Sequence, residues 1–263
     1  MTHEQTTETL LEVDAISLSF GGVHALVDVS FDIRTGEVRS IIGPNGAGKS
    51  SMLNVINGFY HPQEGTITYQ GQARKQMRPH DAAAGGIART FQNIALFKGM
   101  TVLENIQTGR CLMNKASVLS QAFRLAKSRR EDDESREKAE ELLEFLEIQA
   151  IRKTSVGQLP YGLQKRVELG RALAAEPKVL LLDEPMAGMS PDEKQDMTRF
   201  ILQAKEAYGM TVVLIEHDLG VVMDISDHVI VLDYGRKIAD GMPEEIKRDQ
   251  KVIDAYVGKN TDI

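Results

Sequence analysis

The residues whose pattern most clearly indicates chemistry form one run, Gly43-Pro44-Asn45-Gly46-Ala47-Gly48-Lys49-Ser50. Its spacing, G-x-x-x-x-G-K-[ST], is typical of a phosphate-binding loop, because glycines let backbone N–H groups converge on phosphate oxygens. In such a loop the Lys49 ammonium reaches the β- and γ-phosphates, and the Ser50 hydroxyl is a ligand of Mg²⁺. We therefore expect this run, with the adjoining Ser51, to bind ATP and Mg²⁺. A glycine turn that binds no nucleotide is the alternative interpretation.

A pair of carboxylates follows an apolar stretch later in the chain. Residues 179–182 are Val-Leu-Leu-Leu, which predicts a strand of a parallel sheet covered on both faces, and Asp183 and Glu184 come directly after it. Ligands of α/β proteins bind at the carboxyl ends of such strands. We expect Asp183 to hold the water shell of Mg²⁺ and Glu184 to polarise the attacking water. An acidic turn without a catalytic role is the alternative, and the phosphate-loop pattern argues against it.

The elements around these motifs alternate between strands and helices. Alternating apolar and polar side chains predict a half-buried strand over 27–33. Further strands are expected at 37–42, 66–70, 179–182, 211–215 and 228–232. One helix is expected from Lys49 to Gly58, and another from Pro191 with Ser190 as its N-cap. A short helix is expected near 219–223. This order predicts a parallel α/β core.

A charged, helical region interrupts the predicted core at about residues 96–156. Its run 127–141 is almost wholly polar, which we interpret as a solvated helix surface. Four side chains spaced i, i+3, i+4 and i+7 predict one apolar helix face: Ala139, Leu142, Leu143 and Leu146. We therefore interpret the region as a helical insertion.

The bulk composition limits the classes of protein that fit. The chain has 263 residues, 42% of them hydrophobic, and a net charge of −7, which argues against a nucleic-acid binder. The single cysteine, Cys111, fits a reducing cytoplasm, and we interpret it as a half-buried small hydrophobe. No stretch has the ~18 apolar residues of a spanning helix, and residues 1–10 do not resemble a signal peptide. Any membrane role would therefore depend on partner chains.

The phosphate loop and the carboxylate pair indicate a P-loop NTPase, and three further features indicate which subclass of these enzymes it is. They are Gln92 in the run Arg89-Thr90-Phe91-Gln92, the segment Leu159-Pro160-Tyr161-Gly162-Leu163, and His217 after a strand. With them the chain resembles ATP-binding-cassette (ABC) ATPases along essentially its whole length. The resemblance implies that Gln92 touches Mg²⁺ and its water and senses a transmembrane partner. It also implies that His217 contacts the γ-phosphate and that Phe20 stacks on adenine. Without it, His217 would be read as a structural histidine and Phe20 as a core aromatic.

The same resemblance implies a P-loop NTPase fold, with a mainly parallel sheet, an N-terminal antiparallel β part and an inserted helical subdomain. We expect a single nucleotide-binding domain over 1–263, with the catalytic core at 1–95 and 166–240. The helical subdomain would be 96–165 and the C-terminal tail 241–263. In this family two subunits meet head to tail, so Tyr161, Gly162 and Leu163 are expected to contact the nucleotide of the opposite subunit.

Two segments depart from the family pattern. The signature usually reads Leu-Ser-Gly-Gly-Gln, whereas here Pro160 replaces the serine and supplies neither a hydroxyl nor an N–H. We place Pro160 in the first turn of a helix over 162–175, where its missing donor costs nothing. We hypothesise that the helix N-terminus and the Gly162 amide supply the anion site, so that Pro160→Ser changes ATPase activity only modestly. Ser190 stands where many relatives carry an aspartate.

Other stretches resemble the ATPases of branched-chain amino-acid importers, among them Leu214-Ile215-Glu216-His217-Asp218 and the tail Ile253-Asp254-Ala255-Tyr256-Val257-Gly258. The resemblance implies two permease subunits, a second ATPase subunit (the same chain or a paralogue), an indirect link to a periplasmic binding protein, and a place on the inner face of the membrane. Urea or amide import and lipopolysaccharide export remain alternatives. A soluble ABC ATPase of translation or DNA repair and a non-hydrolysing regulatory binder are the rivals from other classes.

Overall fold

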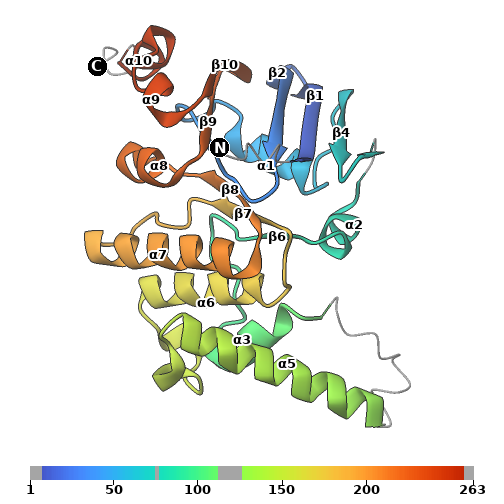
Figure 1. Cartoon of the computed structure of the whole chain (residues 1–263), viewed down its shortest axis with the longest axis vertical. Coiled ribbons are helices and arrows are strands. Elements are labelled where there is room, and N and C mark those ends of the chain that lie inside the picture. The colour runs from blue at the N-terminus through green and yellow to red at the C-terminus, as the bar shows by residue number, and fades with distance from the viewer. Residues whose placement is uncertain (1–7, 75–76, 112–125, 258–263) are drawn as a thin grey trace, which may run out of the picture.

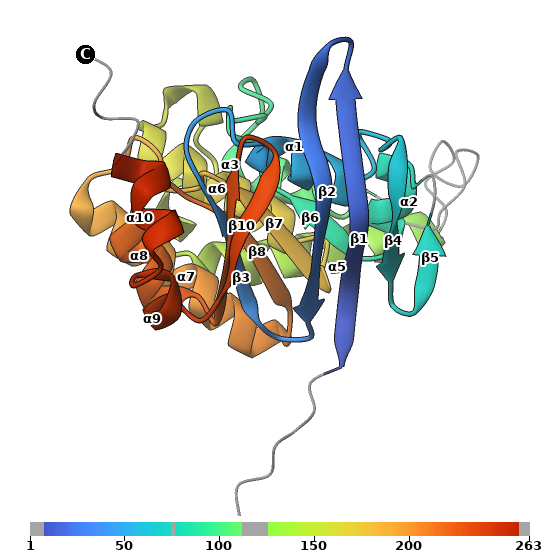
Figure 2. The same cartoon turned by 90° about the horizontal axis from the view of Figure 1, so that it is seen from above.

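A computed structural model describes residues 8–74, 77–111 and 126–257, and within them the strands form two sheets (Figure 2). The first is antiparallel, in the order β2-β1-β4-β5, with β1 Thr9–Phe20, β2 Val23–Arg34, β4 Glu64–Tyr69 and β5 Gln72–Arg74. The second has the order β10-β9-β3-β8-β7-β6. Its strands are β3 Val38–Ile42, β6 Ile87–Arg89, β7 Val179–Asp183, β8 Thr211–Ile215, β9 His228–Asp233 and β10 Arg236–Gly241. Only β10 pairs antiparallel in this second sheet, so the predicted α/β class is confirmed.

The helices lie on both sides of the parallel strands. The described ranges contain α1 Lys49–Ile56, α2 Pro79–Ala84, α3 Val102–Thr108, α5 Ala126–Phe145, α6 Tyr161–Leu173, α7 Pro191–Tyr208, α8 Leu219–Ile225, α9 Pro243–Ile246 and α10 Gln250–Val257. Short 3-10 turns span Gln149–Ile151 and Val156–Gln158. In Figure 1, α7 lies beside the strands, α6 lies against α7, and α5 lies beyond α6.

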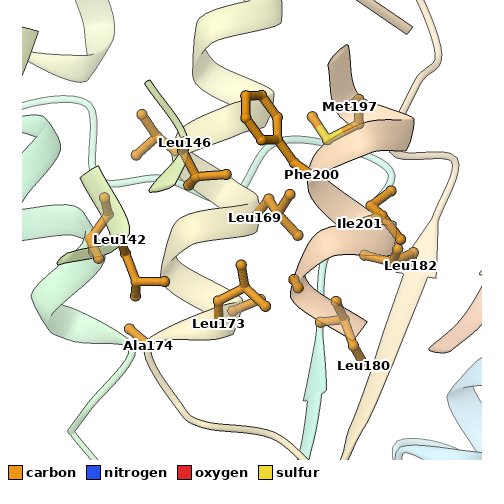
Figure 3. Close-up of a cluster of buried hydrophobic side chains, with 14 of the residues drawn as sticks. Leu142, Leu146, Leu169, Leu173, Ala174, Leu180, Leu182, Met197, Phe200 and Ile201 are labelled. Carbon is orange, nitrogen blue, oxygen red and sulfur yellow. The ribbon is translucent and has the colours of Figure 1, made fainter. Parts of the chain in front are cut away.

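Strand β7 explains how the two sides of the sheet form two cores. All five of its residues are buried, as the apolar run predicts. Leu180 and Leu182 pack with α6 and α7, whereas Val179 and Leu181 pack with α1 and the antiparallel sheet. Figure 3 shows the first of these cores, in which side chains of α5, α6 and α7 meet those of β7. The Asp183-Glu184 pair therefore leaves a strand that is fixed on both faces.

Several sequence predictions need correction. In β2 the extra residue of a bulge, next to Asp28 at φ +53°, shifts the alternation, so Leu26 is fully buried and Val27 only partly. Strand β4 begins at Glu64, two residues before the predicted start at 66. Pro160 is the N-cap of α6, with an extended ψ of 153°, and not part of its first turn. Cys111 is exposed.

Other local predictions are confirmed. The four residues of the expected apolar face on α5 and the turn after it have no exposed surface. Ser190 is the N-cap of α7, and its hydroxyl accepts a hydrogen bond from the Glu193 N–H. Part of the predicted helical region, residues 112–125, lies outside the described residues.

Candidate functional site

The phosphate-loop pattern lies between β3 and α1, and two of its glycines are required by close backbone contacts. A Cβ on Gly43 would lie 2.0 Å from the carbonyl oxygen of Leu232 on β9. A Cβ on Gly48 would lie 2.5 Å from the carbonyl oxygen of Ala25 on β2. Both residues also have positive φ, +148° and +102°. Only glycine allows the loop to turn tightly between the two sheets.

The loop borders a cavity of about 340 Å³. The side chain of Lys49 is buried, and its ammonium donates hydrogen bonds to the carbonyl oxygens of Gly43 (2.7 Å) and Pro44 (3.0 Å). The residues that line the cavity are Val23, His24, Ala25, Asn45, Gly46, Ala47, Gly48, Lys49, Ser50, Ser51, Gln92, Glu184 and His217. Segments far apart in the sequence thus meet at one site, including Gln92, Glu184 and His217.

Glu184 is the residue on which these segments converge. Its Oε1 lies 2.8 Å from Nε2 of His217, and its Oε2 accepts a hydrogen bond from Nε2 of Gln92 at 3.1 Å. Its backbone has φ +50°, in the left-handed region, and its N–H donates to the carbonyl oxygen of Ile215. A non-glycine residue in a sparsely populated region costs about 1–3 kcal/mol, so surrounding contacts must hold it there. The contacts with His217 and Gln92 therefore fix the orientation of the Glu184 carboxylate at the cavity.

Asp183, in contrast, is buried beside the cavity and does not line it. Its Oδ2 accepts a hydrogen bond from the Arg89 guanidinium at 2.8 Å, and the same guanidinium bonds the Asn54 side chain on α1. Oδ1 is buried and has no hydrogen-bond partner in the described parts of the chain. Sequence reasoning did not single out Arg89 as a site residue. The sequence did not predict strand β6, and the carboxylate partner of Arg89 lies 94 positions away, so no local pattern indicated this contact.

Two further residues that support the site were missed. Glu216 is buried and accepts hydrogen bonds from the backbone N–H groups of Met186 (2.7 Å) and His217 (3.2 Å). Burial raises the pKa of Glu216, although these two N–H groups oppose the shift. Tyr256 of α10 packs near Ile42. Burial raises the pKa of its hydroxyl to about 12, and the backbone N–H of Gly43 acts in the opposite direction.

The remaining candidates lie outside the Lys49 cavity. Phe20 is half exposed and contacts Tyr60 edge to face, with ring centroids 4.9 Å apart. Tyr161, Gly162 and Leu163 form the first turn of α6. Gly43 and Pro44 contact the Lys49 ammonium through their carbonyl oxygens, although neither residue lines the cavity.

Comparison with known proteins decides the family. Residues 26–187 match the family model of the ABC transporter, and residues 236–261 match that of the branched-chain amino acid ATP-binding cassette transporter. The chain belongs to the ABC transporter ATPase family. This ABC ATPase is 39% identical over 250 residues to the high-affinity branched-chain amino acid transport ATP-binding protein BraF of Pseudomonas aeruginosa, covering 95% of this chain and 98% of that one. It is 35% identical to the corresponding LivG protein of Escherichia coli, covering 96% and 99%.

Solved structures agree with this assignment. The ADP conformation of MJ1267, an ATP-binding cassette of an ABC transporter, superposes with a TM-score of 0.83 at 36% identity, covering 96% of this chain and all of that one. A dimeric post-hydrolysis state of the cassette MJ0796, bound to ADP and phosphate, gives a TM-score of 0.76 at 25% identity over 89% of this chain and 99% of that one. The chain is therefore a nucleotide-binding ATPase. None of the helices in its described ranges has the length and apolar character that crossing a membrane requires.

Proposed function

We propose that this ABC ATPase hydrolyses ATP with Mg²⁺ to drive the import of branched-chain amino acids or a related small polar solute. The observation that carries the catalytic part is the position of Glu184 between Gln92 and His217, across one cavity from Lys49. The solute is proposed from the match of residues 236–261 and from the names of the relatives.

Each residue at the cavity has a chemical task in this proposal. The Lys49 ammonium exchanges its two carbonyl acceptors for the β- and γ-phosphates, and the loop N–H groups of residues 43–51 bind phosphate oxygens. Glu184 accepts a proton from the attacking water, and His217 donates a hydrogen bond to the γ-phosphate. Phe20 stacks on the adenine. Residues 161–163 complete the site of the opposite subunit.

The residues present also fit Mg²⁺. This ion prefers oxygen ligands and is commonly held by one or two carboxylates, waters and substrate phosphates. Ser50, the Gln92 amide oxygen and the unpartnered Oδ1 of Asp183 supply such oxygens, Asp183 through water. The phosphates of the nucleotide and water would supply the remaining ligands. Bound there, the ion would neutralise charge that develops during phosphoryl transfer.

We further propose that the chain pairs with a second ATPase, itself or a paralogue, beneath two permeases on the inner face of the membrane, with a periplasmic binding protein linked indirectly. The core would be residues 1–95 and 166–240, the helical subdomain 96–165 and the tail 241–263. A groove of about 910 Å³, whose lining includes Phe91, Phe97, Met100 and Arg171, is the proposed permease contact. Three of these side chains, Phe91, Phe97 and Met100, are apolar and exposed, as expected of an interaction surface.

The test is transport in a defined system. The chain is purified from membranes with its permeases, which mass spectrometry identifies. The complex is placed in vesicles with ATP on the face that carries this chain, and with the binding protein and the solute on the other face. We expect ATP-dependent uptake of leucine that Lys49→Ala abolishes. Uptake of urea or an amide in place of leucine would overturn the proposed solute. No affinity for ATP with Mg²⁺ would overturn the whole proposal.

A further inference from the structure

A buried ion pair on α6 has no part in the chemistry proposed above. Nζ of Lys165 lies 3.5 Å from Oε2 of Glu168, and the two side chains are 1% and 2% exposed. Burying two charges is costly unless hydrogen bonds satisfy them, and apolar side chains would pack the helix more favourably. The other positions of α6 already supply that packing, through Val167, Leu169 and Leu173. The pair therefore needs an explanation other than core packing.

Its hydrogen bonds go to one segment of main chain, residues 91–95, which contains Gln92. Lys165 donates to the carbonyl oxygens of Phe91 (3.4 Å) and Gln92 (3.2 Å). Oε1 of Glu168 accepts from the N–H groups of Phe91 (3.3 Å) and Ala95 (3.4 Å). The pair thus bonds N–H groups at both ends of the segment and carbonyl oxygens at its start.

Arg171 extends the same arrangement. It lies three residues after Glu168, on the same helix face, and donates to the carbonyl oxygen of Ala95 at 2.6 Å. We call Lys165, Glu168 and Arg171 the α6 clamp. It fixes a segment that has no regular secondary structure, by directional bonds to its backbone.

We propose that the α6 clamp positions Gln92 for turnover by fixing the backbone of residues 91–95 to α6. This inference rests on the proposed role of Gln92. The clamp holds the Gln92 carbonyl while the Gln92 amide reaches Glu184. Phe91, Ala95 and Arg171 also line the groove proposed for the permease.

Toward the beginning of α6, the clamp lies near Tyr161, the first residue of that helix. Nζ of Lys165 lies 5.8 Å from the centroid of the Tyr161 ring. Lys165 therefore contacts both the Gln92 carbonyl and the Tyr161 ring, whereas Glu168 and Arg171 hold Phe91 and Ala95. The clamp residues touch neither nucleotide nor metal in this scheme, so they are positioning residues.

The experiment uses Glu168→Gln and Lys165→Met in the purified full chain. The matched control is Asp240→Asn, which breaks another ion pair of low exposure, Arg39–Asp240 (2.7 Å; 5% and 23% exposed), away from the loop. Hydrogen exchange is followed by mass spectrometry on peptides that cover residues 86–98, without nucleotide. ATP turnover gives kcat and KM.

Glu168→Gln keeps an oxygen acceptor for the Phe91 and Ala95 N–H groups but removes its charge, and hydrogen bonds to a neutral acceptor are weaker. Exchange at these two residues should therefore rise about tenfold. We expect kcat to fall about tenfold with KM for ATP within about twofold, because the phosphate loop is unchanged. Asp240→Asn should alter neither quantity by more than about twofold. Equal effects in the control, or normal exchange at 91 and 95, would overturn the clamp.

Two outcomes separate this inference from the proposed function. Faster exchange with unchanged kcat would show that the clamp holds the loop but does not position Gln92 for turnover, and the inference would fail. A wild-type chain without ATPase activity would defeat the proposed function, while the exchange data would still decide whether the clamp exists. If Glu168→Gln does not fold, Arg171→Met, at a partly exposed position, removes the Ala95 contact alone and should raise exchange across 86–98 in the same way.

Discussion

Glu184→Gln separates the proposed base from every other function of this site. Glutamine has the same length and the same Cβ geometry, so the strain at φ +50° is unchanged. Its amide oxygen and NH₂ group can still bond His217 and Gln92, which now lie 2.8 Å and 3.1 Å from the carboxylate oxygens. The substitution therefore removes the proton acceptor and little else.

A positioned general base contributes about 10²–10⁴ in rate. At 1.36 kcal/mol for each factor of ten, the variant should raise the activation free energy by about 2.7–5.4 kcal/mol. ATP affinity should stay within about threefold, because Lys49 and the phosphate loop are untouched. Single-turnover phosphate release measures the first quantity, and titration with a fluorescent ATP analogue measures the second. Glu206→Gln, at an exposed position of α7, is the control.

Normal turnover in Glu184→Gln would refute the assignment of the base, and the nearest buried acids, Asp183 and Glu216, would then need testing. Loss of both turnover and affinity would instead mean that the Gln92–Glu184–His217 contacts hold the cavity itself together.

Three other perturbations test the supporting structure. Leu142→Ala removes a fully buried side chain and should lower the free energy of unfolding by about 2–5 kcal/mol, measured by urea denaturation. Tyr256→Phe removes the hydroxyl whose pKa the Gly43 N–H influences, and should weaken ATP binding by about 0.5–1.5 kcal/mol, measured in the same titration. Unchanged affinity would show that α10 does not support the loop. Burial raises the pKa of Glu216, so its charged form is disfavoured in the fold and its contribution to stability falls as the pH rises from 4.5 through the raised pKa. The melting temperature of the wild type, relative to that of Glu216→Gln, should fall over that range.

The parts of the fold that depend on local patterns could be predicted from the sequence. The apolar run before Asp183 is typical of a parallel strand that is buried on both faces. Ser190, three residues before Glu193, is a capping-box pattern that predicts the start of a helix. The bulge in β2 was missed because Asp28 looks like any polar residue of an alternating strand, and its φ of +53° depends on pairing with β1.

The partners of charged side chains could not be predicted for the same reason. Arg89 and Asp183 are 94 positions apart, and the Met186 N–H reaches a carboxylate 30 positions away. Their approach depends on the order of strands β6, β7 and β8 in the sheet, which a single sequence does not fix. The sequence therefore singled out Asp183 as a candidate but not Arg89, the residue that holds it in place.

The two departures from the family pattern are connected in space. A Cβ on Gly162 would lie 2.1 Å from Oε1 of Glu193, the same side chain that bonds the Ser190 N–H at the start of α7. A Cβ on Gly188 would lie 3.4 Å from the Tyr161 ring. The beginnings of α6 and α7 therefore pack on each other, and each needs an N-cap compatible with the other. Serine is as good an N-cap as aspartate but adds no charge beside the Glu193 carboxylate. Pro160, the N-cap of α6, makes no side-chain hydrogen bond to the amides of the first turn, which have no intrahelical partners in any helix. In the dimer that we propose, an anion bound at those amides would lie near Glu193, and the absence of a second carboxylate at position 190 would keep the potential there more favourable for phosphate.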